Sequence, residues 1–185
     1  MLASGIVVML GLLALGFMGL FFASGMPFGA GYQPVPRKAI GAMLDFSDPE
    51  GKAVYDLGSG FGRILFEASA RNPRRCVGVE IDPLKCWWTR MEANRRGLQG
   101  VIEVVRANLL DVDLSEADVV LVFLTPRLMK KLKRKAVQEM KPGSVVVSYD
   151  HRFEGWAPEV EDAELNVRLY RVPSRLVIAR RQPND

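Results

Sequence analysis

Apolar and polar positions alternate in blocks along most of this 185-residue chain. Short apolar runs rich in β-branched residues predict strands at 53–57, 76–81, 102–106, 117–124, 144–149, 165–172 and 176–180. Longer stretches between them predict helices at 37–46, 63–70, 83–96 and 127–140. Strands that are apolar throughout and alternate with helices are typical of a parallel sheet covered on both faces. We therefore expect an α/β, Rossmann-like domain with a mostly parallel seven-stranded sheet, in which only the closing strands depart from the alternation.

The first part of the chain has a different pattern, because no charged side chain precedes Arg37. The run from Gly5 to Ala23 is apolar on every helical face, and a bilayer crossing needs about 20 such residues. We predict a transmembrane helix over 1–24 and a Gly- and Pro-rich linker over 25–36. A cleaved signal peptide is the alternative, although no basic residue precedes the apolar run. Arg37 and Lys38 follow the segment, so the positive-inside rule predicts a single-pass membrane protein whose catalytic domain faces the cytoplasm.

Charge and cysteine content narrow the function classes only slightly. The formal net charge is +4, which permits attraction to anionic partners but establishes none. Two cysteines do not make a disulfide framework, and a single histidine, His151, excludes a His-based metal site. Basic residues crowd the helix predicted at 127–140, where a solvated face is the simplest interpretation and anionic lipid the second. Without an aromatic platform beside these residues, no nucleic-acid partner is expected.

The strongest chemical signal is a glycine-rich loop between the first strand and the next helix. It reads Asp56-Leu57-Gly58-Ser59-Gly60-Phe61-Gly62. Glycines let the backbone turn tightly and approach a ligand closely. The third glycine comes one residue too early for the dinucleotide fingerprint, and an acidic residue precedes the first glycine. This pattern suits a cationic nucleoside without phosphates, so we predict S-adenosylmethionine as the cofactor.

Later strand ends supply further candidate cofactor contacts. Glu80 lies about 20 residues beyond the glycine loop, where an acidic side chain can accept hydrogen bonds from ribose hydroxyls. Asn108 follows the third strand and is placed to contact an adenine edge. The complete predicted cofactor set is Asp56, Gly58, Ser59, Gly60, Gly62, Arg63, Glu80, Ile81, Asn108 and Leu109.

With these motifs the sequence resembles a known family. It is similar to the small broad-specificity archaeal protein-lysine methyltransferases and to their membrane-tethered mitochondrial relatives that act on the ATP synthase c-subunit and on adenine nucleotide translocase. The matching segments are 32–36 (YQPVP), the Asp56 loop, 78–81 (GVEI), 108–113 (NLLDVD), 123–126 (FLTP) and 141–143 (KPG) followed by Ser148. Two positions depart from the family: Phe61 replaces an acidic residue and Arg37 replaces a threonine.

The resemblance implies transfer of a methyl group from S-adenosylmethionine to a lysine amine of a protein substrate, by a methyltransferase domain over 37–185. Candidate catalytic residues are Thr125 after the fourth strand, Tyr149 and Asp150 after the fifth, and Tyr32 in the segment before the first helix. Together with the predicted anchor, the resemblance suggests a membrane protein or membrane-associated protein as substrate. A lipid or small-amine methyltransferase and a non-catalytic cofactor-binding membrane module remain the alternatives.

Overall fold

The structure is a computed structural model that describes residues 2–23 and 33–174, with side chains of the first helix placed at residues 5–16 and 19. The chain divides into two units, 1–33 and 34–185, which we describe separately. In the first unit, helix α1 (Leu2–Ala23) exposes its apolar side chains, among them Val7 and Leu12.

The structure corrects the prediction of a transmembrane helix. Among the residues whose placement is described, no helix is both long enough and apolar enough to cross a membrane. The prediction of a single-pass membrane protein with a cytoplasm-facing domain is therefore wrong as well, because it depended on that helix. The linker predicted over 25–36 lies mostly outside the described residues.

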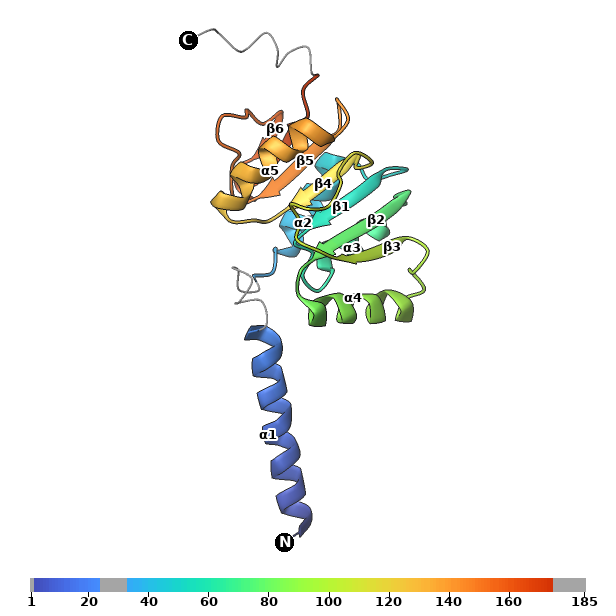
Figure 1. Ribbon diagram of the computed structural model, residues 1–185, viewed down its shortest axis with the longest axis vertical. Helices are drawn as coiled ribbons and strands as arrows, with labels where there is room; N and C mark the ends of the chain where they lie inside the picture. Colours follow the sequence, from blue (N-terminus) through green and yellow to red (C-terminus); the bar gives the residue numbers. More distant parts are fainter. Residues whose placement is uncertain (1, 24–32, 175–185) are drawn as a thin grey trace. The chain divides into compact units, whose positions relative to one another are not determined.

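The second unit is an α/β domain built on one sheet (Figure 1). Its helices are α2 (Arg37–Ser47), α3 (Arg63–Ser69), α4 (Pro83–Arg95) and α5 (Pro126–Glu139). Its strands are β1 (Ala53–Leu57), β2 (Arg75–Glu80), β3 (Ile102–Arg106), β4 (Val119–Val122), β5 (Val145–Tyr149), β6 (Val160–Asp162) and β7 (Val167–Arg171). The strand order is β3-β2-β1-β4-β5-β7-β6. This order reverses between β1 and β4, the point at which Rossmann-like sheets bind ligands beyond the carboxyl ends of their strands.

The sheet is mixed, which corrects the predicted mostly parallel arrangement. Strands β3, β2, β1, β4 and β5 run parallel, whereas β7 is antiparallel to both β5 and β6. A parallel neighbour would need a crossover connection, usually a helix, and residues 150–166 contain only loops and β6. Strand β6 was missed because it is three residues long with two acidic residues, and the strand predicted at 176–180 lies outside the described residues.

Alternate residues of each central strand pack into two separate cores. Val54 of β1 and Val119 of β4 face α2, α3 and α4, whereas Tyr55 and Val120 face α5. Strands β1 and β4 are buried at every position because helices cover both faces. This packing fixes the carboxyl ends of β1, β2, β4 and β5 at one edge of the sheet, where the predicted site residues lie.

Candidate functional site

The glycine loop leaves β1 with three residues in the left-handed region of backbone conformation. The φ angles of Gly58, Gly60 and Gly62 are 85°, 56° and 75°. The amides of Gly58 and Ser59 both donate to the Val79 carbonyl, at 2.8 and 3.1 Å, which ties the loop to the end of β2. A side chain at Gly58 would lie 3.3 Å from the Leu124 side chain, so the loop also adjoins the exit of β4.

Asp56 is a buried carboxylate at the entrance to this loop. Its exposed fraction is 2%, and its Oδ2 atom has no hydrogen-bond partner among the described residues. Burial raises the pKa of Asp56 to about 8, and the nearby charge of Glu80 contributes to the shift. An unpaired buried carboxylate is costly, so this group favours the binding of a cation beside it.

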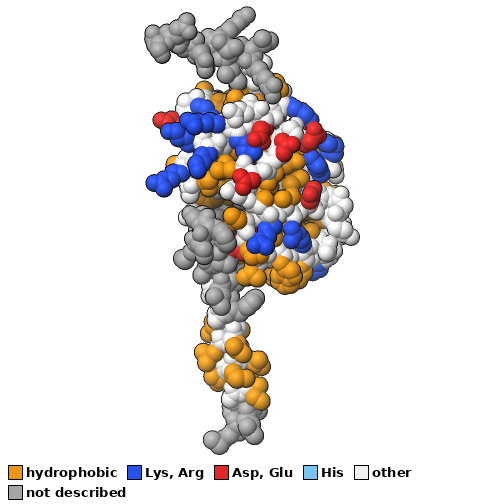
Figure 2. All heavy atoms as spheres, in the orientation of Figure 1, with side chains coloured by type: hydrophobic (Ala, Val, Ile, Leu, Met, Phe, Trp, Pro, Cys, Tyr) orange, Lys and Arg blue, Asp and Glu red, His pale blue; other side chains and the backbone are white. Residues whose placement is uncertain are grey.

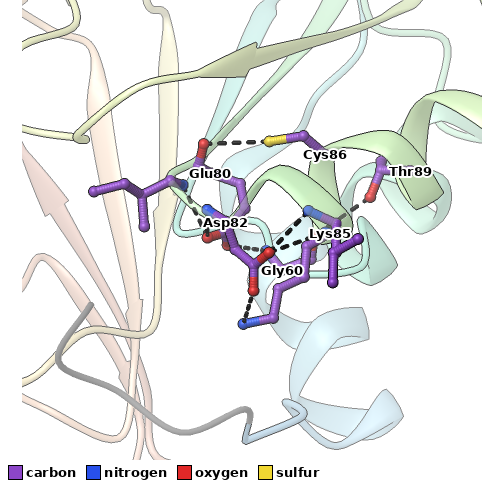
Figure 3. A network of polar contacts seen from close by, with 8 residues as sticks. Gly60, Glu80, Asp82, Lys85, Cys86 and Thr89 are labelled. Atoms are coloured by element: carbon purple, nitrogen blue, oxygen red, sulfur yellow. Dashed lines mark hydrogen bonds and ion pairs between the residues drawn. The ribbon is translucent and has the colours of Figure 1, made fainter. Parts of the chain in front are cut away.

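Glu80 connects the end of β2 to the glycine loop (Figure 3). Its Oε2 accepts the Gly60 amide at 2.9 Å, and its Oε1 accepts the amides of Ile81 and Asp82, each at 2.9 Å. A carboxylate has about four acceptor positions, so one remains for a ribose hydroxyl. The side chain that the sequence predicts as a ribose ligand therefore also shapes the loop that surrounds the cofactor.

A second layer of polar residues supports this loop and was missed by the sequence analysis. Asp82 is fully buried, caps α4 through its contact with the Leu84 amide at 2.9 Å, and pairs with buried Lys85 at 3.4 Å. Thr89, further along α4, donates to the Gly60 carbonyl at 3.3 Å (Figure 3). The available signal was Asp82 directly before Pro83, which is typical of a helix cap.

The residues present fit S-adenosylmethionine. Two buried polar atoms at the glycine loop, Asp56 Oδ2 and Ser59 Oγ, have no partner within the described part of the chain. They offer an anionic acceptor and a hydroxyl beside a backbone that can approach a ligand closely. A cationic amino-acid group with a nucleoside matches this set of donors and acceptors better than a pyrophosphate does.

The remaining predicted cofactor residues lie around the same edge of the sheet. Arg63 is the half-buried first residue of α3, and Ile81 is 36% exposed after β2. Asn108 is exposed after β3, and its Oδ1 accepts the Leu110 amide at 3.1 Å, so the side-chain amide nitrogen is its available donor. Leu109 is half-buried against the core that faces α5.

Three of the candidate catalytic residues, Thr125, Tyr149 and Asp150, follow the ends of β4 and β5. Thr125 is exposed at the start of α5, and its side chain does not cap that helix. Tyr149 packs edge-on against Phe123, with ring centroids 5.0 Å apart. The Asp150 carboxylate lies 3.7 Å from His151 Nε2, and the His151 ring is 6.4 Å from the Phe123 ring. The structure thus places three predicted residues after the ends of two paired strands, and Leu124, next to Thr125, lies near the glycine loop.

Asp150 is held in a left-handed conformation, with φ of 67°, by residues that face each other across β5 and β7. Buried Arg168 donates to the Asp150 carbonyl at 3.0 Å and to Glu161 at 2.9 Å. Its register partner Ser148, also buried, donates to the His151 carbonyl at 2.9 Å. Arg168 was not predicted, because an arginine between apolar positions of a strand normally faces solvent, whereas here it is buried.

Tyr32, the fourth predicted catalytic residue, lies outside the described residues. Its role remains a prediction from the resemblance.

Comparison with known proteins identifies the family. Residues 56–160 match the family described as the ANTKMT methyltransferase domain. The chain belongs to this family. It is 37% identical to a protein-lysine N-methyltransferase of Saccharolobus islandicus over 145 residues, which cover 75% of this chain and 90% of that protein. It is 31% identical to the Homo sapiens lysine N-methyltransferase of the ATP synthase c-subunit, over 69% of this chain but only 54% of the human protein. The resemblance noted from the sequence is thereby confirmed.

A solved structure extends the agreement to the cofactor. The RNA methyltransferase of Salinibacter ruber in complex with S-adenosyl-L-homocysteine superposes with a TM-score of 0.74 and 33% sequence identity, covering 83% of this chain and 98% of that one. This ANTKMT-family protein is therefore an S-adenosylmethionine-dependent methyltransferase with a class I, Rossmann-like fold. The predictions of enzyme class and cofactor are confirmed.

Proposed function

We propose that this methyltransferase modifies the side-chain amine of a lysine in a protein substrate. The observation that carries the proposal is the grouping of a carboxylate and an aromatic pair where the paired strands β4 and β5 end, near the cofactor loop. Asp150 supplies the negative charge, and Phe123 with Tyr149 supplies aromatic surface. Ammonium groups bind favourably to both features. The names of the Saccharolobus islandicus and human relatives support the same acceptor.

The chain's own residues have three tasks in this reaction. Bound S-adenosylmethionine supplies the methyl group, and Asp56, Ser59 and Glu80 are the side chains that would hold it. A free lysine amine has a pKa of about 10.4 and attacks only when neutral, so the site must orient it and accept its proton. We assign that task to Asp150, whose carbonyl is fixed by Arg168. The Thr125 hydroxyl, which is not used in helix capping, is placed to hydrogen-bond the amine.

RNA is the second candidate acceptor. It is favoured by one observation, the description of the Salinibacter ruber structure as an RNA methyltransferase. The two candidates predict different chemical products, because lysine methylation survives ribonuclease and RNA methylation survives protease.

The test uses the full-length chain with tritiated S-adenosylmethionine and two fractions of the source cell, total protein and total RNA. We expect label in the protein fraction, recovered as methyl-lysine after acid hydrolysis. The Asp150→Asn variant should lose most of this label and still bind cofactor in calorimetry, whereas Glu50→Gln, an exposed acid in the turn before β1, should behave as wild type. Label confined to ribonuclease-sensitive material would contradict the lysine proposal and favour RNA.

A further inference from the structure

Helix α5 presents a stripe of positive charge that the fold itself does not use. Arg127, Lys130, Lys131 and Arg134 are all exposed, and their spacing places them on one face of the helix. The opposite face buries Met129, Leu132 and Ala136 against the sheet. Figure 2 shows Lys and Arg side chains gathered over α5. We call these four residues the α5 stripe.

Other lysines of α5 serve the structure, which sets the stripe apart. Lys133 donates to the carbonyls of Glu154 and Gly155 at 2.6 and 2.8 Å, and Lys135 pairs with Glu139 at 2.7 Å. Within residues 33–174, no ion pair or side-chain hydrogen bond involves any member of the α5 stripe. Like charges three or four residues apart on a helix repel one another. The stripe is therefore mildly unfavourable for the free protein, and an anionic partner would remove that repulsion.

The position of the α5 stripe connects it to the site. Helix α5 begins at Pro126, directly after Thr125, and Leu124 lies against the cofactor loop near Gly58. The stripe therefore starts close to the carboxyl end of β4 and extends along the helix for about 10 Å, since each residue rises about 1.5 Å. That length corresponds to about three residues of an extended chain. A substrate whose reactive group reaches Thr125 has flanking residues within reach of the stripe.

We propose that the α5 stripe binds an acidic segment of the substrate protein, with Asp or Glu residues close in sequence to the methylated lysine. This inference rests on the proposed function. Carboxylates complement the stripe in charge and spacing, and such complementarity selects partners and speeds their encounter. Single-stranded nucleic acid, the other anionic polymer, is usually bound by cations interleaved with aromatic residues. No residue of α5 is aromatic, so the helix favours an acidic peptide.

The direct test is a binding measurement that does not depend on turnover. The probes are two fluorescent peptides of about 15 residues with one central lysine, flanked by Glu and Asp in one and by Gln and Asn in the other, and an RNA of about the same number of nucleotides. With the full-length chain at low salt, we expect the acidic peptide to bind about tenfold more tightly than its neutral counterpart, and the preference to shrink at about 0.3 M salt. Equal affinity for the two peptides would overturn the inference, and so would a preference for the RNA over the acidic peptide.

Matched variants locate the effect. The triple variant Lys130→Gln, Lys131→Gln and Arg134→Gln should abolish the preference for the acidic peptide while leaving the affinity for cofactor unchanged. The control triple Lys52→Gln, Arg71→Gln and Arg95→Gln removes the same charge from other surfaces, where each residue forms an exposed ion pair. It should keep the preference. A loss of preference in both triples would mean that net charge, rather than the stripe, is responsible.

The methylation assay separates this inference from the proposed function. If the acidic peptide is methylated with a lower KM than the neutral one and the stripe variant equalises the two, both proposals stand. If both peptides are methylated with the same KM, the stripe proposal fails and lysine methylation stands. If the acidic peptide binds at the stripe but only RNA is methylated, the proposed acceptor fails and with it the assignment of the acidic segment to a substrate.

Discussion

The two halves of the sheet, which meet between β1 and β4, differ in how deeply they bury their candidate functional side chains. The half containing β1, β2 and β3 buries carboxylates, Asp56 and Glu80 among them, next to a loop with three left-handed glycines. The half containing β4, β5, β7 and β6 leaves Thr125 and Asp150 exposed, and holds Asp150 through an arginine that follows it by 18 residues. The first half has buried groups that fit the cofactor. In the second half the candidate catalytic residues are accessible from solvent.

The largest expected effect is a loss of cofactor affinity when a residue of the first half is changed. Asp56→Asn keeps the shape of the side chain but removes the buried negative charge that a cationic cofactor would meet. Loss of one member of a buried charge pair costs about 2–5 kcal/mol, so we expect the dissociation constant of S-adenosylmethionine to rise about 30-fold or more in calorimetry.

The control for this change is Asp45→Asn, an exposed aspartate on α2 whose side chain is 65% accessible. It should bind cofactor as wild type does. An Asp56→Asn protein that binds cofactor normally would show that the buried carboxylate serves the fold alone.

A steric change in the same half should have the next largest effect. A Cβ atom at Gly78 would lie 2.4 Å from Leu65 Cδ1 and 2.9 Å from Ser59 Oγ. Gly78→Ala must therefore move the Leu65 side chain on α3 and the Ser59 side chain in the cofactor loop, and overpacking of this kind costs about 1–3 kcal/mol of stability. Gly100→Ala, where a Cβ meets nothing within 4 Å, is the matched control. Urea denaturation and cofactor titration of both variants test the expectation, and equal stability of the two would refute it.

Arg168→Met should affect the second half and spare the first. It removes the hydrogen bond to the Asp150 carbonyl and the pair with Glu161, and we expect a loss of about 2–3 kcal/mol of stability, since hydrogen bonds to charged groups contribute about 1.5–3 kcal/mol. Turnover with lysine should fall because Asp150 is no longer held, while the affinity for cofactor stays unchanged.

Arg171→Met is the control for that variant. Arg171 lies on the same strand but pairs with Glu159 at the surface, and exposed pairs contribute at most about 1 kcal/mol. A parallel loss of cofactor binding in Arg168→Met would mean that the two halves are not separable.

The cofactor half was largely predictable from sequence because its contacts are local. Asp56, the glycines and Glu80 fall within one strand-helix-strand unit of about 25 residues, and each adopts a conformation that its residue type favours. The sequence does not reveal that Glu80 has a structural role beside its predicted contact with ribose. Its carboxylate oxygens accept hydrogen bonds from backbone amides of the loop and of the residue after β2. Backbone hydrogen bonds of a loop do not depend on a recognisable motif.

The acceptor half was predictable only in outline. The sequence indicates that Thr125 follows the fourth strand and that Tyr149 and Asp150 follow the fifth, and parallel strands such as β4 and β5 end at the same edge of the sheet. The contact of Arg168 with Asp150 depends on the antiparallel register of β5 and β7, which in turn depends on the helix-free connection between them. The pattern of one strand does not show which other strand it pairs with, so this contact could not be predicted.

The smallest expected effect concerns the buried charge of the first half. It is measured as the pH dependence of protein stability without cofactor. Burial and Glu80 raise the pKa of Asp56 to about 8 in the folded protein, whereas an unfolded aspartate titrates near its usual pKa of about 3.9. Between these two values the folded state holds a proton that the unfolded state has released. The stability that Asp56 contributes is therefore complete below about pH 4 and is lost as the pH rises to about 8.

Asp56→Asn has no such proton, so its free energy of unfolding relative to wild type should increase steadily from about pH 5 to about pH 8, as measured by urea denaturation at each pH. Parallel curves for the two proteins would show that Asp56 is ionised in the folded state throughout. Saturating S-adenosylmethionine should flatten the wild-type dependence, because a bound cation lowers the pKa of the carboxylate beside it and releases the proton before the protein unfolds. No such flattening is expected if the unpaired Asp56 oxygen does not face the ligand. This measurement thus distinguishes a buried carboxylate that binds the cationic cofactor from one that has no contact with it.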